Sequence, residues 1–183
     1  MSDNFRILGV GGAGINAVRA LGYKNSIFID SNSFDSSKPI SEIVKPGGKD
    51  DRIIIVSSPA GVFSSRVLKS ICSVFNSRGN RVFLIGILPF HSESPERKRR
   101  GELLLRELNA LVDSTVLVEN ENFASIMMER PWSEALDKIN NYVGSLVRNF
   151  VSGSENADAV RKGEYSIAGS SAEYVPNAAI SPN

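Results

Sequence analysis

The chain has 183 residues, of which 42% are hydrophobic and 22% charged, so it can bury one sizeable hydrophobic core and is predicted to form a single domain with or without a tail. Its 21 Lys and Arg residues against 20 Asp and Glu residues leave a formal net charge of +1. A charge this close to zero excludes a global electrostatic attraction to nucleic acid or to an anionic membrane, so any ligand must be bound by a local site.

Short apolar runs alternate with helix-like periods from residue 5 to residue 151. The apolar runs predict strands over residues 5–10, 26–30, 52–56, 81–88 and 114–118. The periodic stretches predict helices over residues 14–22, 64–75, 95–111 and 132–151. Strands that are apolar throughout and separated by helices are typical of a parallel sheet covered on both faces. The predicted fold class is therefore α/β, with a doubly wound, mostly parallel, Rossmann-like sheet.

The composition changes after residue 151, where Gly, Ser, Ala, Asn and Pro become frequent and only short apolar pieces such as residues 165–168 remain. This change predicts a main, nucleotide-binding domain over residues 1–151. Residues 152–183 are predicted to be a C-terminal extension or a weakly formed final element.

The segment LGVGGAGINAV, residues 8–18, spans the end of the first predicted strand and the start of the helix that follows it. Its glycines at positions 9, 11 and 14 fit the GxGxxG fingerprint of dinucleotide-binding loops. Glycine lets backbone amides approach a phosphate closely, and the N-terminus of the following helix adds a partial positive charge. The pattern predicts an anion-binding turn, and a tight strand-to-helix turn without a ligand is the alternative.

Asp30 ends the second predicted strand, where dinucleotide-binding proteins place an acidic residue on the ribose hydroxyls. On this pattern alone, the ligand stays open between NAD, FAD and another nucleotide. The chain has one His and one Cys, so a metal site built from those residue types is not expected.

Several segments together resemble the FtsZ and tubulin superfamily. ILGVGGAGINAVRAL is similar to its first nucleotide loop, which in FtsZ reads close to GVGGxGxNAV, with an asparagine at the place of Asn16. IFIDSNSFDS is similar to the FtsZ segment that follows the second strand, and VFLIGILPF is similar to a strand that ends in a Pro-Phe pair. The resemblance extends over residues 5–150 and implies a tubulin/FtsZ GTPase-type domain.

The resemblance implies a binding site for GTP or GDP and is compatible with a Mg²⁺ ion bound together with the nucleotide. Residues of the first loop match those that hold phosphate or ribose, and Glu93 and Arg97 match a glutamate and an arginine at the sugar and phosphates. Three amide side chains match positions nearer the base, where an amide can both donate to and accept from the guanine edge. The whole set of candidate nucleotide-binding residues is Gly11, Gly12, Ala13, Gly14, Asn16, Asp30, Ser64, Ser65, Glu93, Arg97, Asn120, Asn140 and Asn141.

Two loops depart from the FtsZ pattern. Where FtsZ has a glycine-rich phosphate loop after the third strand, this chain reads SSPAGVFSSR, residues 57–66, with one glycine and a proline that has no amide to donate. Ser64 and Ser65 can offer hydroxyls to an anion there, and ordinary N-capping of the next helix is the alternative. KPGGKDD, residues 45–51, resembles a shortened terminal-phosphate loop, with Gly47 and Gly48 as its remnant.

In FtsZ and tubulin polymers, the carboxylates that activate water come from the next subunit. The matching region here, SENADAVR, offers Asp158 as the candidate catalytic residue but lacks the full pair of aspartates. We therefore expect GTP hydrolysis to be weak, absent or dependent on a partner. The second domain of FtsZ does not fit in the residues after 151, so self-association and assembly with a filament-forming partner both stay open.

The leading hypothesis is a guanine-nucleotide-binding FtsZ/tubulin-like protein with a cytoskeletal or cell-division-related role in assembly or its regulation. Three alternatives stay open: a nucleotide-free scaffold that assembles with other subunits, an NAD-binding Rossmann enzyme that uses Asp30, and a slow GTPase whose missing domain another chain supplies. No nucleic-acid partner is expected.

The N-terminal sequence MSDNFRILGV lacks the basic start and the long apolar run of a signal peptide. The longest apolar runs have the length of a strand, well short of the ~18 residues or more that a membrane span needs. The single cysteine, Cys72, cannot form an internal disulfide. We therefore expect a cytoplasmic protein without direct membrane insertion.

Overall fold

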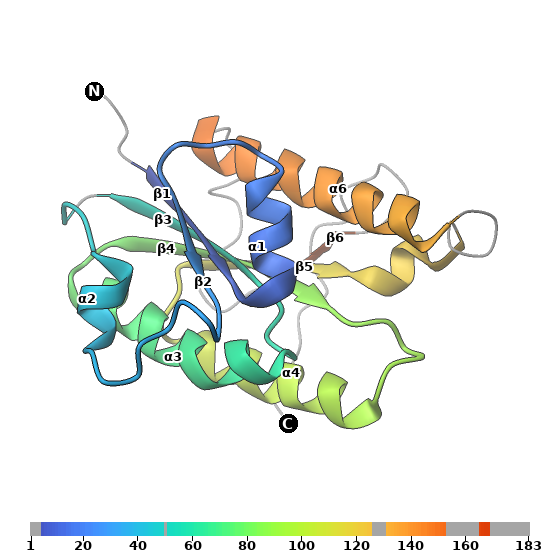
Figure 1. Cartoon of the computed structure of the whole chain (residues 1–183), viewed down its shortest axis with the longest axis horizontal. Helices are drawn as coiled ribbons and strands as arrows, with labels where there is room; N and C mark the ends of the chain where they lie inside the picture. Colours follow the sequence, from blue (N-terminus) through green and yellow to red (C-terminus); the bar gives the residue numbers. More distant parts are fainter. Residues whose placement is uncertain (1–4, 50, 126–130, 153–164, 169–183) are drawn as a thin grey trace.

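The computed structural model describes residues 5–49, 51–125, 131–152 and 165–168. Strands and helices alternate along the chain (Figure 1). In chain order the elements are β1 (Phe5–Val10), α1 (Gly11–Arg19), β2 (Ser26–Ile29), α2 (Ile40–Val44), β3 (Arg52–Ser57), α3 (Val62–Ser77), β4 (Arg81–Leu88), α4 (Pro95–Leu108), β5 (Ser114–Glu119), the 3-10 helix η1 (Asn120–Phe123), α6 (Trp132–Ser152) and β6 (Tyr165–Ala168).

The six strands form one sheet in the order β2-β1-β3-β4-β5-β6, and every neighbouring pair is parallel. This confirms the predicted α/β class with a parallel sheet. The chain runs from β1 outward to β2 and then returns across β1 to β3, so the direction of winding reverses between β1 and β3. In open α/β sheets, ligands bind at the carboxyl ends of the strands beside such a switch point.

Helices cover both faces of the sheet, α2, α3 and α4 on one face and α1 and α6 on the other (Figure 1). Residues of β3 face the two helix layers alternately. Ile53 and Ile55 belong to the core beneath α3, whereas Ile54 and Val56 belong to the core beneath α1 and α6. Side chains of successive strand residues point to opposite faces, so a strand covered on both sides must be apolar throughout. The burial of these four side chains reproduces that requirement, since all are fully buried.

The structure differs from the predicted elements at several boundaries. Helix α1 already begins at Gly11 and helix α3 at Val62, earlier than the apolar periods indicated. The short helix α2 was not predicted because its five residues, ISEIV, are too few to show a period. Residues 165–168, the short apolar piece of the C-terminal region, form β6 and pair with β5. The predicted division at residues 151 and 152 stays a prediction.

None of the helices in the described part of the chain is both long enough and apolar enough to cross a membrane.

Candidate functional site

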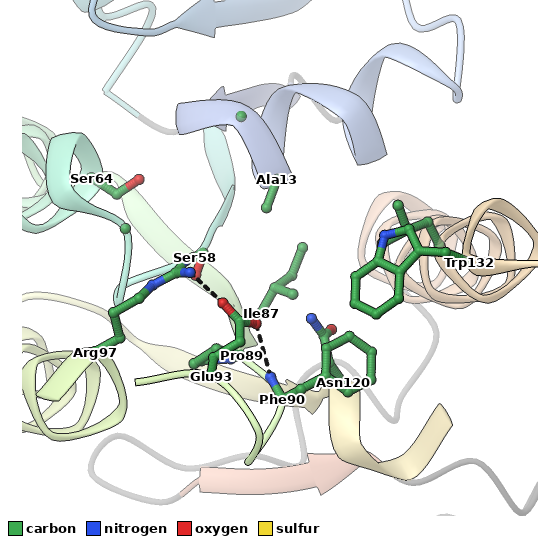
Figure 2. Close-up of a pocket in the computed structure, with 13 residues that line it drawn as sticks. Ala13, Ser58, Ser64, Ile87, Pro89, Phe90, Glu93, Arg97, Asn120 and Trp132 are labelled. Atoms are coloured by element: carbon green, nitrogen blue, oxygen red, sulfur yellow. Dashed lines mark hydrogen bonds and ion pairs between the residues drawn. The ribbon is translucent and has the colours of Figure 1, made fainter. Parts of the chain in front are cut away.

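A pocket of about 350 Å³ lies at the carboxyl edge of the sheet, beside the switch point between β1 and β3 (Figure 2). Its volume falls in the range typical of small-molecule sites. The loops that follow β1, β3, β4 and β5, together with the first turns of α6, supply its walls. The residues that line it are Gly12, Ala13, Ser58, Gly61, Ser64, Ile87, Pro89, Phe90, Glu93, Arg97, Asn120, Trp132 and Leu136.

The glycines of the β1–α1 turn have different roles. Gly11 has φ +72, and a Cβ there would stand 2.4 Å from Ser64 Oγ. A Cβ on Gly14 would stand 2.0 Å from the carbonyl oxygen of Val56, so only glycine lets α1 approach β3. A Cβ on Gly12 would meet nothing within 4 Å, and Gly12 lines the pocket. Gly11 and Gly14 therefore build the turn, and Gly12 leaves the space in front of the turn open.

The N-terminus of α1 makes the pocket favourable for an anion. The first N–H groups of a helix have no acceptor within the helix and carry part of the positive end of its dipole. The first turns of α1 and of α3 contain no acidic residue that would neutralise this charge, and Gly12, Ala13 and Gly61 line the pocket. Two helix N-termini thus border the same space.

Ser64 lines the pocket but its hydroxyl is held by the protein. The Val10 carbonyl oxygen accepts hydrogen bonds from Ser57 Oγ at 2.9 Å and from Ser64 Oγ at 3.4 Å. Ser65 Oγ donates to the Val62 carbonyl at 3.0 Å and does not line the pocket. Helix α3 begins at Val62 with Gly61 as its N-cap, so the alternative reading of the two serines as N-caps is wrong.

Glu93 and Arg97 form an ion pair one helical turn apart, and Glu93 Oε1 also accepts the N–H of Phe90 at 3.1 Å (Figure 2). Arg97 lies at the start of α4 and lines the pocket together with Ser58 (Figure 2). Among the described residues that line the pocket, Arg97 is the one cation and Glu93 the one carboxylate. Their formal charges cancel, which leaves the helix N-termini as the source of net positive potential.

Asn120 begins η1 and lines the pocket opposite Ala13 (Figure 2). Its Oδ1 atom is shielded from solvent and has no hydrogen-bond partner in the described part of the chain. Buried side-chain polar atoms are nearly always paired in native proteins, and the O and N of an amide can exchange places by a flip. Asn120 therefore has amide hydrogen-bonding capacity that a ligand in the pocket could satisfy.

The wall of the pocket that includes Phe90 and the first turns of α6 is aromatic and apolar. Trp132 lies 5.2 Å from Phe90 between ring centroids, at an interplanar angle of 48°, and 52% of Trp132 is exposed. Leu136, one turn later on α6, is 39% exposed and lines the same wall. Sequence reasoning did not assign these two residues to the site. The sequence did contain a signal for them. Trp132 and Leu136 are apolar residues four positions apart at the start of α6, and they do not belong to the buried face of that helix.

Several predicted site residues lie outside the pocket lining. Asn16 is an exposed residue of α1, and Asn140 and Asn141 lie on α6, one turn beyond Leu136. Their contact with a ligand stays a prediction, and Asp158 lies outside the described residues.

Asp30 organises its own turn. Its Oδ1 accepts the N–H of Ser33 at 2.8 Å and that of Asn32 at 3.0 Å. The hydrogen bonds from Ser33, first its N–H and then its hydroxyl, lower the pKa of Asp30, and the bond from Asn32 adds to this. The carboxylate is thus already engaged with backbone N–H groups and does not line the pocket.

The described residues of the 45–51 loop, 45–49 and 51, do not line the pocket, so the interpretation of this loop as a terminal-phosphate loop is wrong. A Cβ on Gly47 would stand 2.0 Å from Asp51 Oδ2 and 2.4 Å from Arg6 Nε, which places this glycine where β1 and β3 begin. Parallel strands begin at one edge of a sheet and end at the other, and the pocket lies where they end. Within the described residues there is also no group of three His, Cys, Asp or Glu side chains that could hold a metal ion.

No protein-family model and no curated protein matches the sequence. Solved structures do match the fold. CetZ1 from Haloferax volcanii, a GDP-bound monomer, has a TM-score of 0.69 at 16% identity over 89% of this chain and 66% of its own. CetZ2 from the same organism, a GTPγS-bound protofilament, has a TM-score of 0.64 at 18% identity over 83% of this chain and 59% of its own.

An empty FtsZ dimer from M. jannaschii matches with a TM-score of 0.65 at 16% identity over 83% of this chain. This chain spans 55% of that FtsZ and 66% of CetZ1, so it corresponds to part of their length. At identities this low the likeness shows the fold and no more. The chain therefore has the α/β fold seen in these FtsZ and CetZ structures.

Proposed function

We propose that the pocket at the carboxyl edge binds a guanine nucleotide, GTP or GDP. The observation that carries the proposal is the meeting, in one pocket, of the N-terminus of α1 with Arg97 and the unpartnered amide oxygen of Asn120. A nucleotide has the matching parts, an anionic phosphate group and a base with hydrogen-bonding edges. The GDP-bound CetZ1 and GTPγS-bound CetZ2 show that proteins of this fold hold such ligands.

In this proposal the phosphates lie at the α1 end of the pocket. The free N–H groups of the first helical turn face an anion there, and the absent side chain of Gly12 allows close approach. Arg97 contributes a guanidinium that binds phosphate oxygens well, and Glu93 orients it through their ion pair. Mg²⁺ would be held chiefly by phosphate oxygens and water, as it commonly is at nucleotide sites.

The base lies at the other end, between Asn120 and the wall formed by Trp132 and Leu136. The amide of Asn120 can donate and accept against a guanine edge, and the apolar wall covers the faces of the base. Asn16, Asp30, Ser65, Asn140 and Asn141 do not line the pocket, so the proposal does not depend on contacts from them.

The proposed role is assembly of a cytoskeletal or cell-division-related filament, or its regulation. The support is the fold alone, since CetZ2 of the same fold was solved as a protofilament. Hydrolysis would depend on a partner chain or on Asp158.

A nucleotide-free scaffold is the second candidate, and the β3–α3 loop favours it. Gly61 donates its N–H to the Ser58 carbonyl at 3.0 Å, so that amide closes the loop instead of facing a ligand. Pro59 has no N–H to offer. This loop therefore provides fewer donors to a phosphate than a loop of glycines would.

The test is a calorimetric titration of nucleotide-stripped protein with GTP, GDP and NADH in one buffer that contains Mg²⁺. We expect saturable binding of both guanine nucleotides and none of NADH. Absence of guanine binding would leave the scaffold as the better account, and NADH binding would favour the Rossmann enzyme.

A variant locates the binding site. Gly12→Val should abolish guanine binding, because the side chain would occupy the space in front of α1, where a Cβ at position 12 meets no protein atom within 4 Å. Ala20→Val, at the exposed C-terminal end of the same helix, is the matched control and should bind as the original protein does. Undiminished binding by Gly12→Val would remove the β1–α1 turn from the site.

A further inference from the structure

A second pocket, of about 420 Å³, is lined by residues at the opposite edge of the sheet, where β1, β2 and β3 begin. Arg6 from β1, Lys24 from the α1–β2 connection and Lys45 from the end of α2 converge on it. Asp51, directly before β3, is the one carboxylate among its described lining residues. These charged groups belong to none of the walls of the nucleotide pocket.

The Arg6 guanidinium is held in one orientation. Its Nε donates to Asp51 Oδ2 at 3.3 Å, and its Nη1 donates to the Lys45 carbonyl at 2.8 Å. Asp51 Oδ2 also accepts the N–H of Gly48 at 3.0 Å, and the Asp51 side chain is only 8% exposed. Arg6 Nη2 makes no hydrogen bond to the described residues, so a fixed donor remains at a guanidinium that is 33% exposed.

The surrounding loop is built to accommodate this ion pair. A Cβ on Gly47 would lie 2.0 Å from Asp51 Oδ2 and 2.6 Å from Arg6 Nη2. Asn80 Nδ2 donates to the carbonyls of Gly48 at 2.7 Å and Lys49 at 3.0 Å, which fastens the loop to the connection between α3 and β4. The site is therefore preorganised, and its geometry does not depend on mobile side chains alone.

The pocket carries an excess of positive charge. Asp51 is paired with Arg6, and neither Lys24 nor Lys45 forms an ion pair with a described residue. Ser26, also in the lining, has a hydroxyl oxygen shielded from solvent without a hydrogen-bond partner in the described part of the chain. Cations that converge in a concave site raise the local concentration of anions.

Lys45 is held in a conformation that glycine would adopt more easily. It follows α2 with φ 43 and ψ 63, and it is the one residue other than glycine with positive φ among those the structure describes. Helices commonly end on glycine in this left-handed conformation because a Cβ is unfavourable there. The sequence thus has a cation at the pocket where backbone geometry alone favours glycine.

We propose that this second pocket binds the phosphate group of a small phosphorylated molecule. Arg6 Nη2 and the ammonium groups of Lys24 and Lys45 bind the phosphate oxygens, since a guanidinium and ammonium groups form strong charge-assisted hydrogen bonds to such an anion. The organic part lies against the half-buried side chains of Phe5 and Ile27, which complete the lining. This site does not depend on the proposed nucleotide site at the other edge.

The experiment is a titration of isotope-labelled protein with inorganic pyrophosphate, followed by the backbone amide signals in NMR spectra. We expect saturable shifts at Lys24, Ser26 and Lys45, separate from any shifts at residues 11–14. Replacing either lysine, as Lys24→Ala or Lys45→Gly, should weaken the binding reported by Ser26 by about tenfold or more. Lys45→Gly should fold with an unchanged or higher thermal midpoint, because it relieves the left-handed conformation.

Two results would overturn the proposal. One is the absence of saturable shifts at Ser26 with pyrophosphate, and the other is equal binding by both lysine variants and the original protein. Citrate is the control for chemical class: binding as tight as that of pyrophosphate would reject a phosphate site in favour of a general anion site. Repeating the titration with the Gly12→Val variant distinguishes the two pockets. This variant should lose the shifts at residues 11–14 and keep the shifts at Ser26.

Discussion

Gly14 on α1 lies directly against Val56 on β3, so close that a Cβ at position 14 would stand 2.0 Å from the Val56 carbonyl oxygen. The contact joins the helix that follows β1 to the strand on the other side of the switch point. It therefore fixes where the N-terminus of α1 points, and with it the geometry of the pocket.

Replacing this glycine should destabilise the protein. We expect Gly14→Ala to lower the free energy of unfolding by at least about 2 kcal/mol, because α1 would have to move away from β3. Gly12→Ala is the matched control and should leave the stability almost unchanged, since its Cβ meets nothing within 4 Å. Urea denaturation followed by circular dichroism measures both, and equal midpoints for the two variants would contradict the close contact.

The fold was predictable to a large extent because its strands are buried on both faces. Continuous apolar runs such as residues 53–56 and 82–85 carry the signal of a parallel sheet in every residue. Element ends were less predictable, since α1 begins at Gly11, and glycine has a low helix propensity. The strand β6 has only four residues, and its pairing with β5 is a long-range contact that no local pattern reveals.

The candidate site was partly predictable for a similar reason. Gly12, Glu93 and Asn120 follow the ends of strands, where the topology of an α/β sheet brings loops together. Trp132 was not predicted because its place depends on how α6 packs across the sheet, which its own neighbours in sequence do not determine. The loop at Gly47 resembled a phosphate loop in composition, but the course of the chain between β2 and β3 puts it at the wrong edge.

The ion pair between Glu93 and Arg97 predicts opposite effects of two substitutions on phosphate binding. Arg97→Ala should weaken binding of pyrophosphate at the nucleotide pocket by about tenfold or more, because it removes the one cation of the described lining. Glu93→Gln should strengthen it, because the negative charge is lost while an amide oxygen can still accept the Phe90 N–H. Shifts of the amide signals of residues 11–14 measure both affinities, and equal weakening by the two variants would contradict these roles.

Asp30 should make stability depend on pH. Hydrogen bonds from Ser33 and Asn32 lower its pKa in the folded state below the usual 3.8. A lowered carboxyl pKa gives stability that is present above the unfolded pKa and is lost as pH falls through the folded pKa. We expect Asp30→Asn to have a lower thermal midpoint than the original protein at neutral pH, with the difference vanishing in acid below the folded pKa. A difference that stays constant with pH would contradict the role of the charge.

Cys72 should report the opening of the core. The thiol is fully buried on α3, and burial raises its pKa to about 12. Because the thiolate is the reactive form, an aromatic disulfide reagent should not label the folded protein and should label it fully in urea. The labelling rate at intermediate urea should follow the unfolding equilibrium. Rapid labelling without denaturant would contradict the buried position of this thiol.

Trp132 is the single tryptophan of the chain, so its fluorescence reports on one wall of the nucleotide pocket. Its indole is half exposed and lies beside Phe90, and a ligand between Trp132 and Asn120 would remove water from the ring. We expect guanine nucleotides to shift the emission to shorter wavelength or to quench it, with an affinity equal to the calorimetric value. Pyrophosphate should bind the α1 end without this change, because it does not reach the apolar wall. If a nucleotide binds tightly by calorimetry but leaves the Trp132 emission unchanged, its base does not lie against this wall.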